Sequence, residues 1–180
     1  MSYDPLTRGP RPPQPVQQQD YPGSESAMDP KPDYGLKTYV SSDRLKDRIA
    51  IITGGDSGIG RAVALAYARE GAHVVIPYLS EDADAKETQR VVEAEGRQCL
   101  LLPGDLVAEE HCRSVVSATI ERFGRLDILI NNAAFQMSRD SILDIPTDEF
   151  DRTIKRTSMR CSGYAKRLSR ISSRGRRSST

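Results

Sequence analysis

The sequence predicts a three-layer α/β fold, in which helices cover both faces of a partial parallel sheet. Short apolar runs rich in β-branched residues alternate along the chain with segments of helical periodicity. Such alternation is typical of repeated strand–helix units. A glycine-rich turn, at residues 53–60, separates the first strand from the first helix. Together these features predict a sheet with the strand order 3-2-1-4.

The first unit covers residues 48–70, with the sequence RIAIITGGDSGIGRAVALAYARE. Residues 49–52 are apolar and β-branched, which indicates a strand buried on both faces. Apolar residues then recur with the spacing of one helix face, at Ile59, Ala62, Val63, Ala66 and Tyr67. Gly71 is expected to end this helix.

Three glycines, Gly54, Gly58 and Gly60, join this strand to this helix with the spacing G-x-x-x-G-x-G. Glycines let backbone N–H groups approach a pyrophosphate, and the helix N-terminus supplies the positive end of a dipole. The spacing differs from the more common G-x-G-x-x-G fingerprint. A purely structural turn is the alternative, but the position between strand and helix favours a dinucleotide site.

Three further strands are predicted, at residues 73–76, 98–102 and 126–130, the first of them ended by Pro77. Residues 83–95 form a helix by composition, and Gly96 closes it.

A third helix is predicted at residues 109–123, with acidic residues in its first turn. Its expected buried side consists of Val115, Val116, Thr119, Ile120 and Phe123. Thr147 or Asp148 could cap a further helix that begins near Glu149.

The glycine turn, read as Thr53-Gly54-x-x-x-Gly58-x-Gly60, is followed after the fourth strand by the tetrad Asn131-Asn132-Ala133-Ala134. This pair of motifs resembles the short-chain dehydrogenase/reductase family over about residues 39–155. The sequence before the first strand and the motif Gly-Gly-Asp-Ser-Gly-Ile-Gly-Arg resemble its glucose/ribitol dehydrogenase-like, or general stress protein, branch. The resemblance implies a Rossmann fold, NAD or NADP as cofactor, and hydride transfer between an alcohol and a carbonyl.

The resemblance also implies which residues bind the cofactor. They are Gly54, Asp56, Ser57, Gly58, Ile59, Gly60, Asp105, Leu106, Asn132 and Ala133. In the family, an aspartate at the position of Asp105 accepts a hydrogen bond from the adenine amino group; alternatively, Asp105 only starts a turn. Asn132 and Ala133 would touch the cofactor ribose.

The choice between NAD and NADP stays open at the end of the second strand. An acid there would bind the ribose 2′-OH of NAD, and a base would accept the 2′-phosphate of NADP. The strand is followed by Tyr78, Leu79 and Ser80, which are neither acidic nor basic. The acids nearby, Glu81 and Asp56 among them, favour NAD.

The family's catalytic residues are a Ser, an Asn and a Tyr–Lys pair spaced Y-x-x-x-K, in which the Lys lowers the Tyr pKa. The expected position of the Asn holds Thr157. Tyr164 is followed four residues later by Leu168, and Lys166 is too close. We therefore assign no catalytic residue, and the three scattered cysteines lack the spacing of metal ligands.

Composition divides the chain into three parts. Residues 1–40 are rich in Pro and Gln, which predicts a disordered arm. Residues 41–155 carry the predicted dinucleotide-binding half-domain. Residues 156–180 hold eight Lys and Arg and no Asp or Glu, and they have no apolar period, which predicts a basic, irregular tail.

A shifted reading frame accounts for this tail. Residues 157–172 can be back-translated and read in a frame that joins the third base of each codon to the first two bases of the next codon. This frame permits the peptide Val-Tyr-Ala-Leu-Phe-Trp-Leu-Cys-Lys-Ala-Ala-Ile-Pro-His-Leu. The peptide is similar to the family's next helix. We therefore expect an oxidoreductase truncated after the fourth strand by a frameshift near Arg156. A genuine basic tail with unspecific affinity for nucleic acid or acidic lipid is the rival reading.

Three functions remain open: a short-chain oxidoreductase, a non-catalytic dinucleotide-binding module, and a truncated product without stable function. The sequence as written favours the truncated product first and the non-catalytic binding module second. A small-molecule substrate is not expected to be turned over, and no specific nucleic acid or membrane partner is predicted. The start of the chain lacks a signal peptide, and the sparse cysteines fit a reducing cytoplasm, so a cytoplasmic location is expected.

Overall fold

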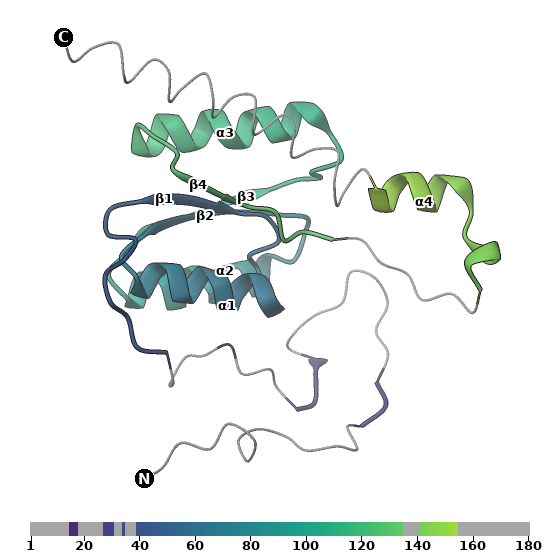
Figure 1. The fold of residues 1–180 in the computed structure, drawn as a ribbon, viewed down its shortest axis with the longest axis horizontal. Helices are drawn as coiled ribbons and strands as arrows, with labels where there is room; N and C mark the ends of the chain where they lie inside the picture. The colour runs from purple at the N-terminus through teal and green to yellow at the C-terminus, as the bar shows by residue number, and fades with distance from the viewer. Residues whose placement is uncertain (1–14, 18–26, 31–33, 35–38, 135–140, 155–180) are drawn as a thin grey trace.

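The fold was analysed in a computed structural model, which describes residues 15–17, 27–30, 34, 39–134 and 141–154. Its centre is a parallel sheet between two helical layers: α1 and α2 cover one face, and α3 covers the other (Figure 1). The predicted three-layer α/β fold is therefore confirmed. The predicted tail at residues 156–180 lies outside the described residues, as does most of the predicted arm.

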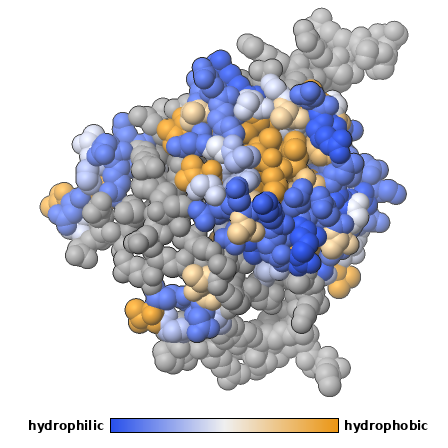
Figure 2. Space-filling view, turned by 180° about the vertical axis from the view of Figure 1, so that it is seen from behind, coloured by the Kyte–Doolittle hydropathy of each residue, from blue (hydrophilic) through white to orange (hydrophobic). Residues whose placement is uncertain are grey.

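The sheet contains β1 (Ile49–Ile52), β2 (His73–Tyr78), β3 (Cys99–Pro103) and β4 (Ile128–Ile130). Its strand order is β3-β2-β1-β4, as predicted, and every pairing is parallel. β1 is buried at all four positions, which explains its continuous apolar sequence. Seen from behind, the molecule carries an apolar patch bordered by hydrophilic side chains (Figure 2).

The helices are α1 (Gly58–Arg69), α2 (Asp82–Ala94), α3 (Glu109–Phe123) and α4 (Thr147–Ile154), with a short 3-10 helix, η3, at Ile142–Asp144. The bounds of α3 match those predicted. Its buried residues include Val115, Val116 and Thr119, while Ile120 and Phe123 pack partly buried against the same core. No described helix is both long and apolar enough to cross a membrane.

The buried face of α1 differs from the predicted one. Ile59 is 78% exposed, and the other four residues of the predicted face are only half-buried. The face toward the sheet instead carries Ala64, Leu65 and Ala68. The small side chains of Ala64 and Ala68 let the helix approach the strands closely, while Val63 and Tyr67 of the predicted face pack partly buried against the same core. The buried face is therefore rotated from the one that periodicity predicted, with these two residues at its border.

The second strand continues through Pro77, where the sequence predicted its end. Pro77 pairs with Leu102 of β3 in the parallel register. Its carbonyl accepts a hydrogen bond from Gly54 N–H on the β1 side, at 2.9 Å. The missing N–H of Pro77 points to that same side, where β1 has already ended, so the proline removes no ladder bond to β3.

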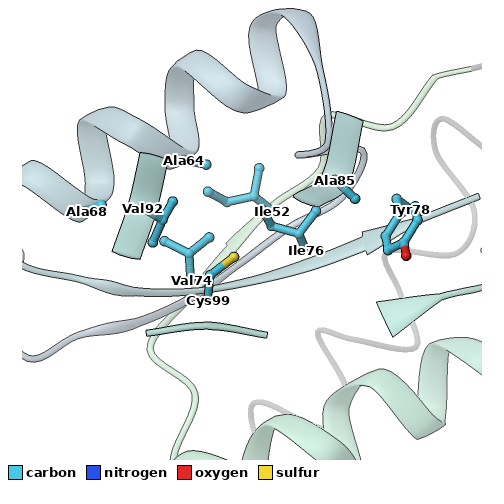
Figure 3. Packing of buried hydrophobic residues seen from close by; sticks show 9 residues of the cluster. All are labelled: Ile52, Ala64, Ala68, Val74, Ile76, Tyr78, Ala85, Val92 and Cys99. Atoms are coloured by element: carbon cyan, nitrogen blue, oxygen red, sulfur yellow. The ribbon is translucent and has the colours of Figure 1, made fainter. Parts of the chain in front are cut away.

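Two apolar cores lie on the two faces of the sheet. The core beneath α1 and α2 is shown in Figure 3 and contains Ile52, Ala64, Ala68, Val74, Ile76, Tyr78, Ala85, Val92 and Cys99. The core beneath α3 includes Ile51, Val75 and Cys112. Cys99 and Cys112 are buried, and neither is in a disulfide. Burial raises the pKa of the Cys99 thiol to about 12, which keeps it protonated.

The segment before β1 is fixed to the end of α1 by one buried carboxylate, Glu70. This group accepts hydrogen bonds from the Tyr39 hydroxyl at 2.5 Å, from the backbone N–H of Ser42 and from Arg44. The Arg44 guanidinium, and then the Tyr39 hydroxyl, hold the pKa of the Glu70 carboxyl well below its usual range.

The low pKa of Glu70 makes the stability of the domain depend on pH. The contribution of Glu70 to the free energy of unfolding should be constant above about pH 5 and fall as the pH drops below about 4.3, the usual pKa of an unfolded Glu. Glu70→Gln should lower stability at pH 7 and flatten this acid dependence, measured by urea unfolding at several pH values. Glu110→Gln, an exposed change on α3, is the control. An unchanged pH profile in Glu70→Gln would contradict the prediction.

Candidate functional site

A pocket of about 350 Å³ opens at the carboxyl ends of β1, β2 and β4. Its lining residues are Gly54, Asp56, Ser57, Gly58, Ile59, Gly60, Pro77, Tyr78, Leu79, Glu81, Leu106, Asn132, Ala133 and Ala134. Open α/β sheets bind ligands at this edge. Nine of the ten residues predicted to bind the cofactor therefore lie around one cavity.

The glycine turn is packed against the end of β4 too closely for larger residues. A Cβ atom added at Gly60 would lie 2.0 Å from the Gly54 carbonyl oxygen and 2.7 Å from Asn132 Nδ2. A Cβ atom at Gly54 would lie 3.1 Å from Ala133 Cα, and Gly54 also has a positive φ of 61°. At Gly58, in contrast, no atom lies within 4 Å. The turn therefore needs Gly54 and Gly60 for its own packing and leaves open space at Gly58.

Thr53 joins the end of β1 to the end of β4, a role that the sequence analysis did not assign. Its hydroxyl oxygen accepts hydrogen bonds from the backbone N–H groups of Asn132 and Ala133, both at 2.9 Å. The hydroxyl donates to the carbonyl of Ile130 at 3.3 Å. The Asn132 side chain donates in turn to the carbonyls of Thr53 and Gly54, each at 3.0 Å. Thr53 and Asn132 together hold the two strand ends that form the floor of the pocket.

The electrostatics of the pocket are set by α1 and by two acids. The N-terminus of α1 faces the cavity, and its first turn holds no acidic residue, so its dipole attracts an anion. Burial is the main cause that raises the pKa of the Asp56 carboxyl. Among the described residues that line the pocket, Asp56 and Glu81 are acidic and none is Lys or Arg.

Tyr78, at the end of β2, is a fixed hydrogen-bond donor. Its hydroxyl donates to Asp82 Oδ1 at 2.6 Å. Burial, and then this hydrogen bond, raise the pKa of Tyr78 to about 12, so the phenol is neutral at every physiological pH.

Asp105 is the predicted site residue that does not line the pocket, although its neighbour Leu106 does. Its carboxylate accepts a hydrogen bond from the backbone N–H of Val107 at 2.9 Å. That bond is typical of a turn, which was the alternative reading of Asp105. In the described part of the chain, no group of His, Cys, Asp or Glu is arranged to hold a metal ion.

Comparisons with known proteins agree with this geometry. A family profile described as "short chain dehydrogenase" matches residues 48–160. General stress protein 39 of Bacillus subtilis is 51% identical over 134 residues, which are 74% of this chain and 47% of that protein. The glucose and ribitol dehydrogenase homolog of Oryza sativa is 43% identical over 149 residues, covering 78% of this chain and 50% of that protein.

Solved structures show the same partial overlap. A short chain dehydrogenase from Burkholderia cenocepacia, crystallised in complex with NADP, is 32% identical with a TM-score of 0.67. The match covers 71% of this chain and 51% of that one. The chain thus spans about half the length of the relatives it matches. Sequence motifs, strand order and pocket agree with these matches, and the chain belongs to the short-chain dehydrogenase/reductase family.

Proposed function

We propose that this chain binds a nicotinamide dinucleotide in the pocket at the carboxyl edge of the sheet and does not catalyse hydride transfer. The observation that carries the proposal is the cavity itself, which gathers Gly54, Gly58, Gly60 and Asn132 around the N-terminus of α1. The pyrophosphate would lie at this N-terminus, and the nicotinamide side would lie toward Asn132 and Ala133. The dinucleotide, when bound, would supply the hydride chemistry of the family.

Catalysis is not expected because the proton-transfer residues of the family are missing from this sequence. The chain has seven tyrosines, and none is followed by a lysine four residues later. Without a positioned tyrosine and lysine, no group is available to move the proton to or from the substrate oxygen. The activity that residues 1–180 support is therefore dinucleotide binding.

We propose a frameshift near Arg156 as the origin of residues 156–180. The shifted reading of residues 157–172 continues to Thr180, where it permits Lys-Pro-Gly-Ala-Ser-Ile-Ile-Asn. A helix-like segment followed by a short apolar run has the pattern of the next helix and strand in an α/β sheet. Sequencing the encoding DNA tests this proposal, because the shifted frame must continue into a Y-x-x-x-K motif; a frame without that motif contradicts it.

Two further parts of the proposal concern the organisation of the chain and its compartment. Residues 41–155 would act as the binding half-domain, between an arm at residues 1–40 and the basic tail. The protein would be cytoplasmic, which the buried thiols of Cys99 and Cys112 support because neither needs an oxidising compartment.

Thermal unfolding of the purified full chain with NAD, NADP and neither tests dinucleotide binding. A ligand at about 100 times its Kd adds about 2.7 kcal/mol to the stability of the folded state. For a chain of this size, the midpoint should rise by about 5 to 10 °C. The comparison of NAD with NADP also decides the cofactor, because the lining acids favour NAD whereas one similar structure was solved with NADP.

Two outcomes contradict the proposal. Unchanged midpoints with both dinucleotides would show that the pocket does not bind them. Steady oxidation of NADPH or NADH with an aldehyde substrate, by chain free of other dehydrogenases, would show that catalysis survives without the tyrosine–lysine pair.

A further inference from the structure

The chain that precedes β1 contacts α1 near both of its ends. At the C-terminal end, the Tyr39 carbonyl accepts a hydrogen bond from Arg69 Nη1 at 3.1 Å, and the Tyr39 hydroxyl donates to Glu70. Toward the N-terminal end, the ring of Tyr34 lies against Arg61, with the ring centroid 5.5 Å from Cζ. Arg61 and Arg69 are separated by about 12 Å along the helix axis. Tyr34 and Tyr39 therefore contact α1 at two points, one near each end of the helix.

Arg61 connects Tyr34 to the glycine turn. Its Nη2 donates to the Asp56 carbonyl at 2.8 Å, and its Nε donates to Thr88 Oγ1 at 2.8 Å. The Thr88 hydroxyl donates to the same Asp56 carbonyl at 2.7 Å. One carbonyl of the turn is thus held by a donor from α1 and a donor from α2.

The network is buried, so its geometry is costly to disturb. Arg61 is 3% exposed and Thr88 is fully buried. Arg61 Nη2 also donates to the Asp84 carbonyl at 3.0 Å and lies 3.4 Å from Asp84 Oδ1. A buried guanidinium needs all of these partners, because a charge left without compensation inside a protein is strongly destabilising. An aromatic face over the guanidinium adds a cation–π attraction and limits its contact with water.

We propose that Tyr34 is a positioning residue for the dinucleotide site. It acts through Arg61, which holds the Asp56 carbonyl and with it the conformation of residues 54–60. The contact of the Tyr34 ring with Arg61 in this way preorganises the pocket before ligand arrives. The effect on affinity rests on the dinucleotide binding proposed above, whereas the effect on the turn does not require a ligand.

The test compares Tyr34→Ala with Tyr34→Phe in the full chain. Titration with NADH and NADPH, followed by nucleotide fluorescence, should give a Kd that rises about three- to tenfold in Tyr34→Ala. Tyr34→Phe keeps the aromatic ring and should bind as the parent chain does. Hydrogen exchange without ligand should be faster at residues 54–60 in Tyr34→Ala only.

A second variant separates positioning from general stability. Tyr39→Phe removes the hydroxyl that bonds Glu70 at the far end of α1. It should lower the unfolding midpoint while leaving the Kd and the exchange of residues 54–60 unchanged. Arg61→Lys removes the guanidinium that donates to several partners at once. In that background, Tyr34→Ala should raise the Kd and speed the hydrogen exchange of residues 54–60 little further.

Each outcome decides one of the two proposals. Unchanged exchange at residues 54–60 in Tyr34→Ala would overturn the positioning role of Tyr34, as would full additivity of Tyr34→Ala and Arg61→Lys. A parent chain that binds neither dinucleotide would overturn the proposed function alone, because the exchange measurement still tests the effect of Tyr34 on the glycine turn. A fall in midpoint in Tyr34→Ala with unchanged Kd and exchange would show a merely structural contact and overturn the proposal.

Discussion

Gly60→Ala is expected to abolish dinucleotide binding and to destabilise the domain by about 3 kcal/mol. The added Cβ atom would lie 2.0 Å from the Gly54 carbonyl oxygen, well inside van der Waals contact. This oxygen belongs to the backbone and accepts a hydrogen bond from Asn132 Nδ2, so it cannot rotate away as a side chain could. The turn must open to relieve the clash, and the first turn of α1 moves with it.

Urea unfolding and dinucleotide titration of Gly60→Ala measure these two effects, with Gly58→Ala as the control for stability. Gly58 has a positive φ of 51° and no atom within 4 Å of an added Cβ. Its replacement costs only the left-handed strain, about 1–2 kcal/mol. If Gly60→Ala were no less stable than Gly58→Ala and still bound dinucleotide, the inference that Gly60 packs too closely on the Gly54 carbonyl for a larger residue would be wrong.

Thr53→Val is expected to lower the free energy of unfolding by about 2–4 kcal/mol. Valine has nearly the same shape as threonine, so the core stays filled. The N–H groups of Asn132 and Ala133 both lose their acceptor, because both bond the Thr53 hydroxyl. Each half-buried donor left without an acceptor costs part of the desolvation energy of an amide. The end of β4 should move, and the affinity for dinucleotide should fall with it.

Thr53→Ser provides the matched control, since serine keeps the hydroxyl and loses only a methyl group. Urea unfolding of both variants should place Thr53→Ser within about 1 kcal/mol of the parent chain. Equal destabilisation of the two variants would show that the methyl group, rather than the pair of hydrogen bonds, accounts for the effect.

The strands and α3 were predictable because their burial is continuous or regular. β1 is apolar at four successive positions and buried at all of them, so composition alone identifies it. The glycine motif and the tetrad at residues 131–134 then located eight of the nine predicted residues that line the pocket; the ninth, Leu106, follows β3. Both motifs follow strands of one parallel sheet, which guarantees that they meet at the same edge.

The residues that hold the site in shape were less predictable. Arg61 is a charged residue within an apolar helix, and nothing in the local pattern indicates that it is buried. Its partners Asp84 and Thr88 are 23 and 27 residues away in the sequence. Thr53 bonds groups 79 and 80 residues away. Such contacts depend on the tertiary arrangement of the helices and strands, which periodicity does not encode.

The pairing of β1 with β4 also has a kinetic consequence. β1, β2 and β3 follow one another along the chain and pair in that order, whereas β4 pairs with β1 across 78 residues, as Ala50 does with Ile128 (128 − 50). Closing so long a loop is slow, so β4 is expected to dock late in folding. An intermediate with three strands would lack the side of the pocket that Asn132, Ala133 and Ala134 line. A dinucleotide can then recognise only the completed sheet, and it should prolong the lifetime of the folded state without hastening its formation.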